Sequence, residues 1–452
     1  MSMVKRIVVI GCSGVGALSA RTLKKLDPFL EVTIIREQEE KGLLTRCATP
    51  YIASGNVMVD PSYKDDAIFL SQGIKIVNVK AVGIDRKEKT VVTVDGSIFP
   101  YDKLVLATGA KPAVFPVSGI DLPGVFTLRR SGDAVNILHW VNSMRVKNAV
   151  VIGAGAIGIE IAYLFSLHSI KITLVEIMEH IMPSVLDPDM SEDLERYIRE
   201  NGVELKLKQR VAVITGEREV EGVNLSSGQN IKAEMVIISG GARSNVDLAK
   251  KAELEIGHLG LKVNEYLQTS DPDIYAAGDV IEYTSFITGK PMLGQLRPNA
   301  VIGGRVAAKN ILGYGVKFPR LINSFVTKFL DKTIAGAGMT ESEAARNGTA
   351  VVAVRQDSAS KHSMMRGKRP YTIKLIFNRK TEKIIGGQIV SDSECPAKHI
   401  DVIAMAIRCG LTASELMTFR CAGQPELSPD PGMEPLALAA EEAWSRSSLG
   451  AE

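Results

Sequence analysis

NAVVIGAGAIGIE, residues 148–160, is the stretch that decides the fold of this 452-residue chain. A short apolar run leads into Gly153, Gly155 and Gly158, which have the spacing G-x-G-x-x-G, and a helix-like sequence follows. In a strand–turn–helix unit the first glycine makes a tight turn, the second lets the backbone approach a pyrophosphate, and the third lets helix and strand pack closely. The stretch therefore predicts a Rossmann-like dinucleotide-binding domain.

The strand expected next, residues 171–176, ends in Glu176. A carboxylate at this place accepts hydrogen bonds from a ribose 2′-hydroxyl and repels a 2′-phosphate. The residues that follow, Ile177 and Met178, offer no cation that could hold such a phosphate. We therefore predict that this domain prefers NADH to NADPH.

A weaker copy of the same pattern stands near the N-terminus. The apolar run 5–10 leads into Gly11, and Gly16 closes the pattern, but Ser13 occupies the middle position. The second strand of this unit is followed by Glu37, which is the candidate for binding a ribose hydroxyl. A single imperfect fingerprint is weak evidence for a nucleotide site when it stands alone.

Two later strand ends suit the same kind of cofactor. The run 101–107 ends in Thr108 and Gly109, where it could close the first sheet beside a nucleotide. Another apolar strand ends in Gly278 and Asp279, and an aspartate there can bond a sugar-like hydroxyl of an extended cofactor. An ordinary strand and turn is the alternative interpretation of each.

Cys47 lies between the two fingerprints, in the segment GLLTRCATPY at residues 42–51. It is either a redox thiol that takes electrons from a flavin, or a small buried thiol of the kind that free cysteines usually form. Pro50 is expected to keep Thr49 out of the α region, so the segment should be extended or turning. Arg46 could lower the pKa of the thiol, although most arginines are ordinary surface groups.

The last third of the chain carries no nucleotide pattern and predicts an α+β dimerisation domain. Cys12, Cys395 and Cys409 are expected to pack. The basic stretch 361–369 is expected to be a solvated loop, and contact with an anionic ligand is the alternative. The runs that read as antiparallel strands are 324–330, 349–355, 371–378 and 384–391, and those that read as helices are 399–408 and 436–444.

The composition gives no reason to propose nucleic acid or a membrane as partner. Lys plus Arg number 54 and Asp plus Glu 51, so the net charge is only +3. Five sparse cysteines with no C-x-x-C or Cys/His cluster favour a reducing cytoplasm and indicate no metal. The apolar stretch 149–167 contains Glu160 and three glycines, so we do not expect a membrane span. A strand-like run at 4–10 leaves no room for a signal peptide, and a cytoplasmic location is expected.

Taken in order, these parts resemble the flavin-dependent pyridine nucleotide–disulfide oxidoreductases over nearly the whole chain. The resemblance implies an α/β fold with two Rossmann-like domains, one for FAD and one for NAD, and a C-terminal α+β dimerisation domain. It also implies a homodimer or a dimer of dimers. The expected boundaries are 1–113 and 244–318 for the two parts of the FAD domain, 114–243 for the NAD domain and 319–452 for the dimerisation domain.

The resemblance assigns roles to individual residues. Cys47 is the expected catalytic residue, and no metal ligand is expected. The segment 240–245 resembles the exit from the family's NAD domain and adds Gly241 to the site. The residues expected to bind FAD or NADH are Gly11, Ser13, Gly14, Gly16, Glu37, Arg46, Thr108, Gly109, Gly153, Gly155, Ile157, Gly158, Glu176, Gly241, Gly278 and Asp279.

The single cysteine resembles one branch of the family. Members such as glutathione reductase have a C-x-x-x-x-C pair and a C-terminal His–Glu pair, whereas Cys47 stands alone. The single-cysteine branch contains NADH oxidases, NADH peroxidases, coenzyme A disulfide reductases and NADH-dependent persulfide reductases. The oxidases and peroxidases carry a catalytic His where this chain has Gly14, and CATPY at 47–51 resembles the Cys-x-x-Pro-Tyr of coenzyme A disulfide reductases. Both features indicate sulfur chemistry rather than oxygen chemistry.

The chain also departs from the coenzyme A disulfide reductases. Leu43 and Arg46 replace the usual Ser and Asn, and segments 362–365 and 421–425 stand where those enzymes supply tyrosines from the partner subunit. His362 or Cys421 could act there instead, or they are a solvated loop and a packed thiol.

The expected function is therefore NADH-dependent reduction of a small persulfide or polysulfide, such as coenzyme A persulfide, with release of sulfide. Coenzyme A itself is a further candidate ligand. The alternatives are a coenzyme A disulfide reductase, an NADH oxidase, and an electron-transfer reductase for a protein such as rubredoxin, in which Cys47 is only structural.

Overall fold

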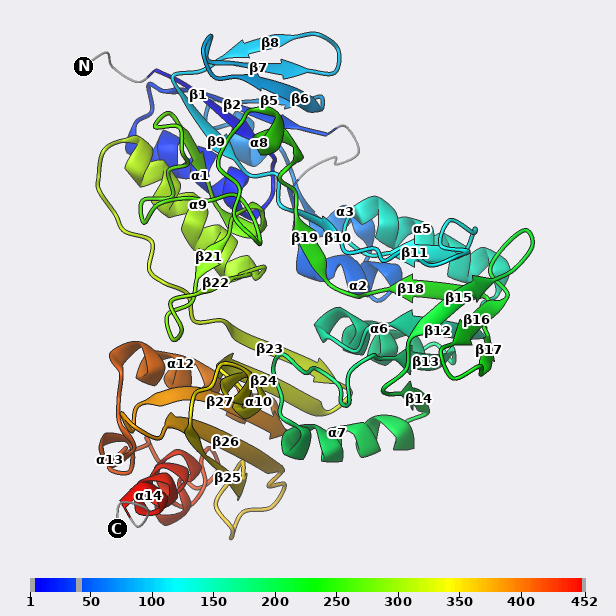
Figure 1. Ribbon diagram of the computed structural model, residues 1–452, viewed down its shortest axis with the longest axis vertical. Helices are drawn as coiled ribbons and strands as arrows, with labels where there is room; N and C mark the ends of the chain where they lie inside the picture. The colour runs from blue at the N-terminus through cyan, green and yellow to red at the C-terminus, as the bar shows by residue number, and fades with distance from the viewer. Residues whose placement is uncertain (1–4, 38–42, 449–452) are drawn as a thin grey trace. The chain divides into compact units, whose positions relative to one another are not determined.

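The computed structural model describes residues 5–37 and 43–448. The chain forms two compact units, each built from several segments (Figure 1). The first unit comprises Met1–Val114, Thr127–Ser143 and Gly241–Leu321, and the second comprises Phe115–Phe126, Met144–Gly240 and Ile322–Glu452.

A parallel sheet of five strands forms the core of the first unit, in the order β20-β9-β1-β2-β5. Its strands are short and apolar because both faces of a parallel sheet are covered, and Val9, Ile34 and Leu104 are completely buried. The bounds are β1 (Arg6–Ile10), β2 (Glu31–Arg36), β5 (Ile74–Asn78), β9 (Lys103–Leu106) and β20 (Ile274–Ala276).

Helices and small antiparallel sheets complete the first unit. Helices α1 and α9 pack against each other so closely that a Cβ at Gly304 would lie 2.5 Å from the Val15 carbonyl oxygen. The helices are α1 (Gly14–Leu26), α2 (Thr49–Ala53), α3 (Val59–Ser62), α4 (Ala67–Leu70), α5 (Ser131–Met144), α8 (Asp247–Lys251) and α9 (Arg297–Ile311). The further strands are β3 (Leu43–Leu44), β4 (Tyr63–Lys64), β6 (Ala81–Asp85), β7 (Thr90–Thr93), β8 (Ile98–Pro100), β10 (Ala110–Pro112), β19 (Ala242–Ser244), β21 (Tyr283–Thr284) and β22 (Pro291–Met292).

The second unit contains the sheet that the opening motif predicts. Its order is β11-β18-β12-β13-β14, and β12 pairs in parallel with both β13 and β18. The strands are β11 (Val125–Thr127), β12 (Asn148–Ile152), β13 (Lys171–Val175), β14 (Val203–Lys206) and β18 (Met235–Ile238), with helices α6 (Ala156–Ser166) and α7 (Pro188–Glu200). A separate antiparallel sheet consists of β15 (Val211–Thr215), β16 (Gly222–Leu225) and β17 (Asn230–Lys232).

An antiparallel sheet with the order β23-β24-β27-β26-β25 makes up the rest of the second unit. Its strands are β23 (Ser324–Phe329), β24 (Lys332–Gly338), β25 (Val351–Ala359), β26 (Pro370–Asn378) and β27 (Ile384–Ser391). The helices around it are α10 (Glu341–Arg346), α11 (Glu394–Ala397), α12 (His399–Cys409), α13 (Ala413–Leu416) and α14 (Pro435–Ser448).

The two faces of this antiparallel sheet meet different partners. Lys374 in β26 is aligned with Gln388 in β27, and both contact the start of α7. Neighbouring residues in a strand point to opposite faces, and a Cβ at Gly387 would lie 2.8 Å from Ile403 of α12. The sheet is therefore covered by the start of α7 on one face and by α12 on the other.

Several expectations from the sequence were wrong in detail. Strand β24 was not expected. The residues expected to pack include Cys395 and Cys409, but both are exposed, because the first lies in the short helix α11 and the second is the last residue of α12. Cys12 is buried as expected.

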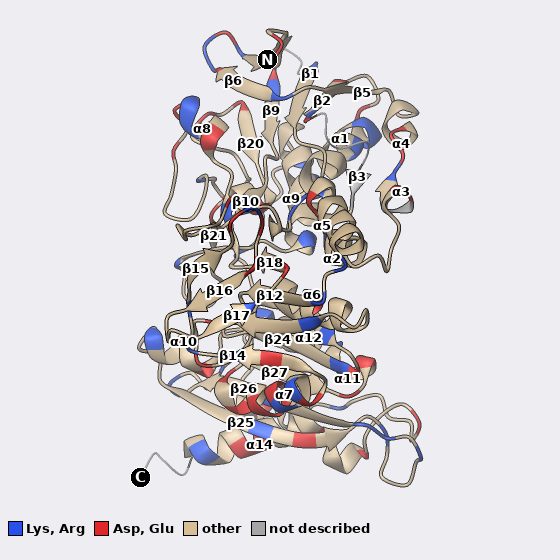
Figure 2. Cartoon of the chain, turned by 90° about the vertical axis from the view of Figure 1, so that its right-hand side faces the viewer, with Lys and Arg blue, Asp and Glu red and all other residues tan. Residues whose placement is uncertain are grey.

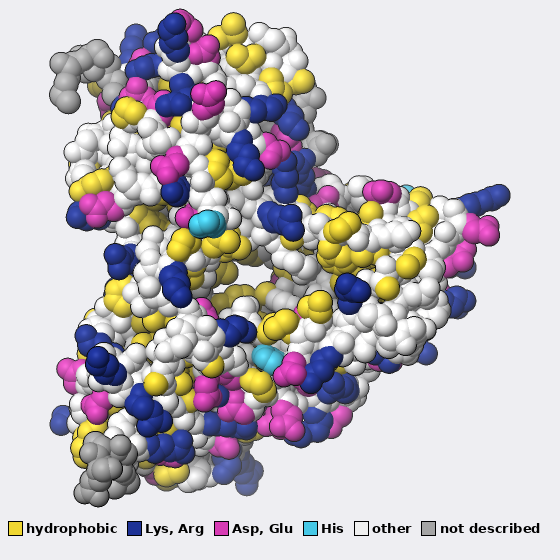
Figure 3. Space-filling view, in the orientation of Figure 1, with side chains coloured by type: hydrophobic (Ala, Val, Ile, Leu, Met, Phe, Trp, Pro, Cys, Tyr) yellow, Lys and Arg dark blue, Asp and Glu magenta, His cyan; other side chains and the backbone are white. Residues whose placement is uncertain are grey.

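The stretch 149–167 folds as β12, a glycine turn and α6. Across residues 5–37 and 43–448, no helix has the length and apolar character needed to cross a bilayer. On the face drawn in Figure 3, basic and acidic side chains are interspersed, in keeping with the nearly balanced charge.

Candidate functional site

Cys47 lies in a short helical segment whose first turn is a 3-10 turn that runs into α2. Its thiol is exposed in the chain, as a nucleophile requires. Thr49 has φ −59° and ψ −40°, so the expectation that Pro50 would hold it in an extended conformation was wrong. Pro50 occupies the first turn of α2, where its missing N–H costs no hydrogen bond. The Thr49 hydroxyl also donates to the Arg46 carbonyl at 2.8 Å, which stabilises the turn.

An arginine that the sequence patterns did not single out connects three of the expected site residues. The Arg129 carbonyl accepts a hydrogen bond from Arg46 Nη1 at 3.1 Å. Nη2 of Arg129 forms an ion pair with Asp279 Oδ2 at 2.5 Å. A Cβ at Gly109 would lie 3.7 Å from the same Nη2. Arg129 therefore brings these parts of the first unit together. Its only signal in the sequence is a pair of arginines, which is too common in loops to be recognised.

In the first glycine turn, between β1 and α1, backbone segments pack directly against each other. Gly11 has φ +105°, and a Cβ there would lie 2.3 Å from the Ala107 carbonyl oxygen. A Cβ at Gly16 would lie 1.9 Å from the Gly11 carbonyl oxygen. Neither position accepts a side chain, which is the reason that the sequence requires glycine at both.

The N-terminus of α1 meets this turn. Ser13 is the N-cap of α1, and its side chain makes no capping hydrogen bond. Gly14 begins the helix, and a Cβ at Gly278 would lie 2.6 Å from Val15 Cγ2, so the Gly278–Asp279 turn packs directly on the helix start. A helix start with backbone N–H groups and a positive dipole end suits a pyrophosphate.

Thr108 and Gly109 are hydrogen-bonded to Asn245, a residue of the last segment of the first unit. Thr108 Oγ1 donates to the Asn245 carbonyl at 2.9 Å, and the Asn245 N–H donates to the Gly109 carbonyl at 2.8 Å. Gly241, with φ +98°, accepts a hydrogen bond from the Ala113 N–H at 2.9 Å. These bonds fix the crossing between β10 and β19.

Glu37 follows β2, as the sequence predicts. Its carboxylate is half-buried and forms ion pairs with Lys80 at 3.1 Å and with Arg130 at 2.8 Å. The preceding residue, Arg36, is buried and is paired with Asp66. Glu37 is therefore the acidic residue at the end of β2, and its contact with a ribose stays a prediction.

The second glycine turn has the same construction in the second unit. Gly153 has φ +105°, and a Cβ at Gly158 would lie 1.9 Å from the Gly153 carbonyl oxygen. Gly155 is the N-cap of α6, and a Cβ there would meet nothing within 4 Å. Packing within the chain therefore does not require glycine at position 155. The open space beside Gly155 would let a ligand approach the backbone closely. Ile157, on the first turn of α6, is exposed.

Glu176 is held beside this turn in a fixed orientation. It is 8% exposed, and its Oε2 accepts a hydrogen bond from the Ala154 N–H at 2.7 Å while Oε1 accepts one from the Met178 N–H at 3.0 Å. Each oxygen of an ionised carboxylate can accept a further bond. Glu176 is therefore fixed beside the glycine turn with capacity for further hydrogen bonds, and its contact with a ribose stays a prediction.

His362 and Cys421, the two residues of the C-terminal domain that could act near Cys47, form contacts with neighbouring residues. His362 Nε2 lies 2.9 Å from Asp430 Oδ2. Burial raises the pKa of the Cys421 thiol, and its hydrogen bond to the buried Glu434 raises the pKa further. Because the thiolate is the reactive form of cysteine, this environment favours the interpretation of Cys421 as a packed thiol.

Comparisons with known proteins identify the family. Residues 5–304 match the pyridine nucleotide-disulphide oxidoreductases, and residues 324–432 match the dimerisation domain of that family. The chain is 35% identical to an NADH oxidase of Methanocaldococcus jannaschii, with 98% of this chain and 99% of the relative covered. It is 31% identical to an NAD(P)H coenzyme A polysulfide/persulfide reductase of Pyrococcus horikoshii, with 95% of this chain and 96% of the relative covered.

A solved structure gives the same result. The NAD-dependent persulfide reductase from A. fulgidus matches with a TM-score of 0.93 and 33% identity, over 98% of this chain and 84% of that chain. The resemblance and the fold class predicted from the sequence are thereby confirmed. The two glycine turns, each at the start of a helix with no side-chain cap, fit two dinucleotides. The chain belongs to the pyridine nucleotide-disulphide oxidoreductases, flavoenzymes that use FAD and NAD(P)H.

Proposed function

We propose that the protein is an NADH-dependent persulfide or polysulfide reductase that works through Cys47. The reaction is NADH + H⁺ + R–S–SH → NAD⁺ + R–SH + H₂S. The observation that carries the proposal is the exposed Cys47 thiol in a helical turn of the first unit, where the remaining cysteine, Cys12, is buried. The persulfide reductases among the relatives support the choice of substrate.

The chain's own part in the reaction is nucleophilic. When bound, FAD supplies the two-electron chemistry that links a nicotinamide to a thiol. The Cys47 thiolate attacks the sulfane sulfur of R–S–SH, forms a new S–S bond and expels R–S⁻, which takes up a proton. An electron pair and one proton then cleave the S–S bond of the Cys47 persulfide, which gives the Cys47 thiolate and H₂S.

The cofactor sites follow the two turns. We assign the FAD pyrophosphate to the turn at Gly11 and the start of α1, with Asp279 as a partner for a cofactor hydroxyl. We assign NADH to the turn at Gly153 and Gly155, with Glu176 on the adenosine ribose. Arg129 would orient Asp279 through their ion pair.

The dimerisation domain at residues 324–432 supports a homodimer as the working form. Coenzyme A persulfide is the proposed substrate within the persulfide class, since relatives named for coenzyme A cover nearly the whole chain. In this assignment R–S⁻ is the thiolate of coenzyme A.

The acceptor can be tested by stopped-flow reoxidation of the NADH-reduced protein. We expect coenzyme A persulfide to reoxidise it at least about tenfold faster than coenzyme A disulfide. Reduction of the Cys47 persulfide releases hydrosulfide, whereas reduction of a mixed disulfide of Cys47 and coenzyme A releases the coenzyme A thiolate, which has the higher pKa and departs more slowly. This chain has His362 and Cys421 in the segments where tyrosines could protonate that thiolate. Equal rates would identify a coenzyme A disulfide reductase instead.

An NADH oxidase is the second candidate, since a relative of that name is 35% identical. Gly14 argues against it, because the oxidases of this branch carry a histidine at this place. Aerobic turnover with NADH and no sulfur compound is the control in the same experiment. Rapid oxygen consumption that yields water would favour the oxidase over the persulfide reductase.

Replacement of Glu176 tests the cofactor preference. In Glu176→Ala, we expect the ratio of kcat/KM for NADH to that for NADPH to fall about tenfold, since a hydrogen bond to a charged group contributes roughly 1.5 kcal/mol. Glu179→Ala is the matched control, because this exposed carboxylate in the same segment is paired with Lys208. If both variants keep the wild-type ratio, Glu176 does not contact the ribose.

A further inference from the structure

The segment from Glu176 to Asp187 connects the end of β13 to α7, and it contacts the glycine turn twice. The Ala154 N–H donates to Glu176 at 2.7 Å, and the Ala154 carbonyl accepts from the Met182 N–H at 2.9 Å. Ala154 lies between Gly153 and Gly155, so both backbone groups of the residue inside the turn are held by this segment. The position of the turn therefore depends on the position of the segment.

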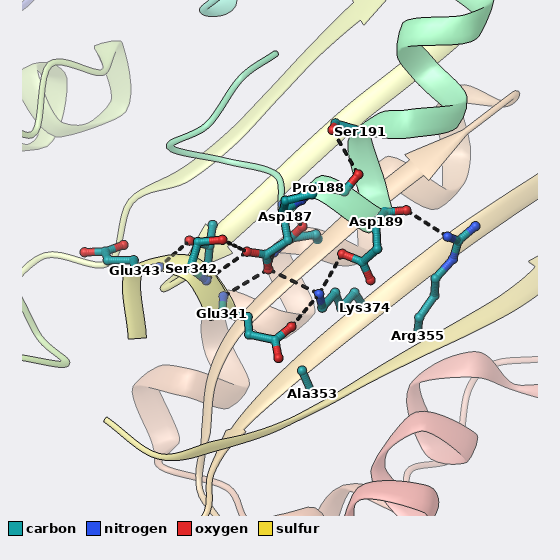
Figure 4. Close-up of polar contacts among 12 residues, drawn as sticks. Asp187, Pro188, Asp189, Ser191, Glu341, Ser342, Glu343, Ala353, Arg355 and Lys374 are labelled. Carbon is teal, nitrogen blue, oxygen red and sulfur yellow. Dashed lines mark hydrogen bonds and ion pairs between the residues drawn. The ribbon is translucent and has the colours of Figure 1, made fainter. Parts of the chain in front are cut away.

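Asp187 fixes the far end of the segment. It is 1% exposed, and its backbone N–H donates to Gln388 Oε1 at 2.8 Å. Its Oδ1 accepts from the backbone N–H of Ser342 at 2.9 Å and from Ser342 Oγ at 2.7 Å, and its Oδ2 accepts from the Glu341 N–H at 2.9 Å and from Gln388 Nε2 at 2.5 Å. Figure 4 shows the bonds from Glu341 and Ser342 converging on the Asp187 carboxylate. Asp187 thus begins α7 and also caps the start of α10.

A buried lysine lies beside this carboxylate. The Lys374 side chain is 4% exposed, and its Nζ lies 2.7 Å from Asp189 Oδ1, 2.8 Å from Glu341 Oε2 and 3.4 Å from Asp187 Oδ2. Burial lowers the pKa of Lys374, but the hydrogen bonds to Asp189 and Glu341 outweigh it and the pKa is raised. The cation is therefore compensated by three carboxylates, which a buried charge requires.

The same interactions act on the Asp187 carboxylate. Burial raises the pKa of Asp187, but hydrogen bonds from Ser342 and Glu341 and the charge of Lys374 outweigh burial and lower the pKa. Figure 2 shows the mixture of acidic and basic residues around α7, β25 and β26. Asp187 is therefore a charged anchor that bonds to β27, to α10 and to Lys374 of β26.

A glycine confines the segment without any charge. Gly336 in β24 lies under Val185, and a Cβ at Gly336 would lie 2.6 Å from Val185 Cγ1 and 3.1 Å from the Val185 carbonyl oxygen. The segment from Met182 to Asp187 is thus held by polar contacts at its end and by close packing two residues earlier. A change at either place must displace it.

We infer that Asp187 is a positioning residue for pyridine nucleotide binding, acting through Met182 and Ala154 on the glycine turn. Asp187 has this role only if that turn binds the nucleotide, as proposed above. Misplacement of a binding group by about 1 Å can weaken a site by up to about 100-fold even when the change lies far from it. A merely structural anchor would change the stability of the protein and leave nucleotide affinity unaltered.

Asp187→Asn is the direct test. The substitution keeps the shape and the capping ability of the residue and leaves Lys374 with Asp189 and Glu341. In the FAD-loaded, oxidised protein, we expect the Kd of NAD⁺, measured by calorimetric titration, to rise roughly tenfold. The KM for NADH should rise by the same factor, while kcat at saturating NADH stays within about twofold of the wild type.

A second variant reaches the same segment from the other side. Gly336→Ala places a methyl group against Val185 and should raise the Kd of NAD⁺ in the same way without removing a charge. Arg355→Ala is the matched control. Arg355 donates to the Asp189 carbonyl at 2.8 Å and lies 3.3 Å from Asp193, so its polar contacts with α7 are made beyond Asp187. It should lower the Tm and leave the Kd unchanged.

The outcomes distinguish the positioning role of Asp187 from the assignment of the nucleotide site to the glycine turn. If Glu176→Ala weakens NAD⁺ binding while Asp187→Asn and Gly336→Ala bind like the wild type, the positioning role is overturned and the nucleotide site stands. If Glu176→Ala also binds like the wild type, the nucleotide site is assigned wrongly and the positioning role fails with it. If Asp187→Asn does not fold, Gly336→Ala decides alone, with wild-type affinity overturning the inference. Equal weakening by Arg355→Ala would overturn it as well.

Discussion

Cys47→Ser protein is expected to bind FAD and to accept electrons from NADH, yet to release sulfide from a persulfide at least about 10³-fold more slowly than the wild type. A serine oxygen cannot hold a sulfane sulfur in a reducible bond, whereas the cofactor sites proposed here lie on the two glycine turns and not on Cys47. Anaerobic stopped-flow absorbance of the flavin measures the first step, and the rate of sulfide release measures the second. Cys395→Ser and Cys409→Ser are matched controls, because both thiols are exposed as Cys47 is. Neither control should slow sulfide release.

Sulfide release by Cys47→Ser at the wild-type rate would remove the thiol from the mechanism. The protein would then be better described as an electron carrier for a protein acceptor such as rubredoxin. Full activity of the variant with such an acceptor would establish that alternative. Mass spectrometry of the native wild-type protein gives an independent check, since a sulfur adduct on Cys47 is expected after exposure to persulfide.

Gly16→Ala should give a protein with little or no flavin. A Cβ at this position would lie 1.9 Å from the Gly11 carbonyl oxygen and 3.1 Å from Val9 Cγ1, so the start of α1 must move away from β1. The N–H groups at this helix start would then no longer face the pyrophosphate, and we expect FAD affinity to fall by about 100-fold. Flavin absorbance per chain after reconstitution measures the effect, with about one FAD per chain expected in the yellow wild-type protein.

Gly132→Ala is the control for this experiment. Gly132 lies in α5, also in the first unit, and a Cβ there would meet nothing within 4 Å. The alanine variant should bind FAD as the wild type does. Normal flavin content in Gly16→Ala would instead mean that the FAD pyrophosphate does not depend on the turn between β1 and α1.

Local signals explain which parts of the fold were predictable. The glycine fingerprint at 153–158 predicted a strand, a turn and a helix, and the structure places β12 and α6 there. Strand β24 was missed because its sequence, KTIAGAG, is dominated by small residues that give little strand signal. Thr49 was wrongly predicted to be extended, because the steric effect of proline on the preceding residue is a bias that the helical turn overcomes.

Contacts between distant parts of the chain explain what remained hidden in the site. Arg129 binds Asp279 across 150 residues of sequence, and Lys374 binds Asp189 across 185. Each is one charged residue among many, and no spacing rule connects it to its partner. The glycines, by contrast, are required by the local backbone, so their spacing alone indicated where they would lie.

The edge strand β20 has a consequence for the order of folding. It completes the sheet of the first unit by pairing with β9, and beside it Lys103 and Asp273, 170 residues apart in sequence, form an ion pair at 2.6 Å. Closing so long a loop is entropically costly and slow. During synthesis the ribosome must therefore release the whole stretch up to Ala276 before this sheet can close. Until then the edge of β9 that β20 will cover is unpaired, and an unpaired strand edge can associate with other chains.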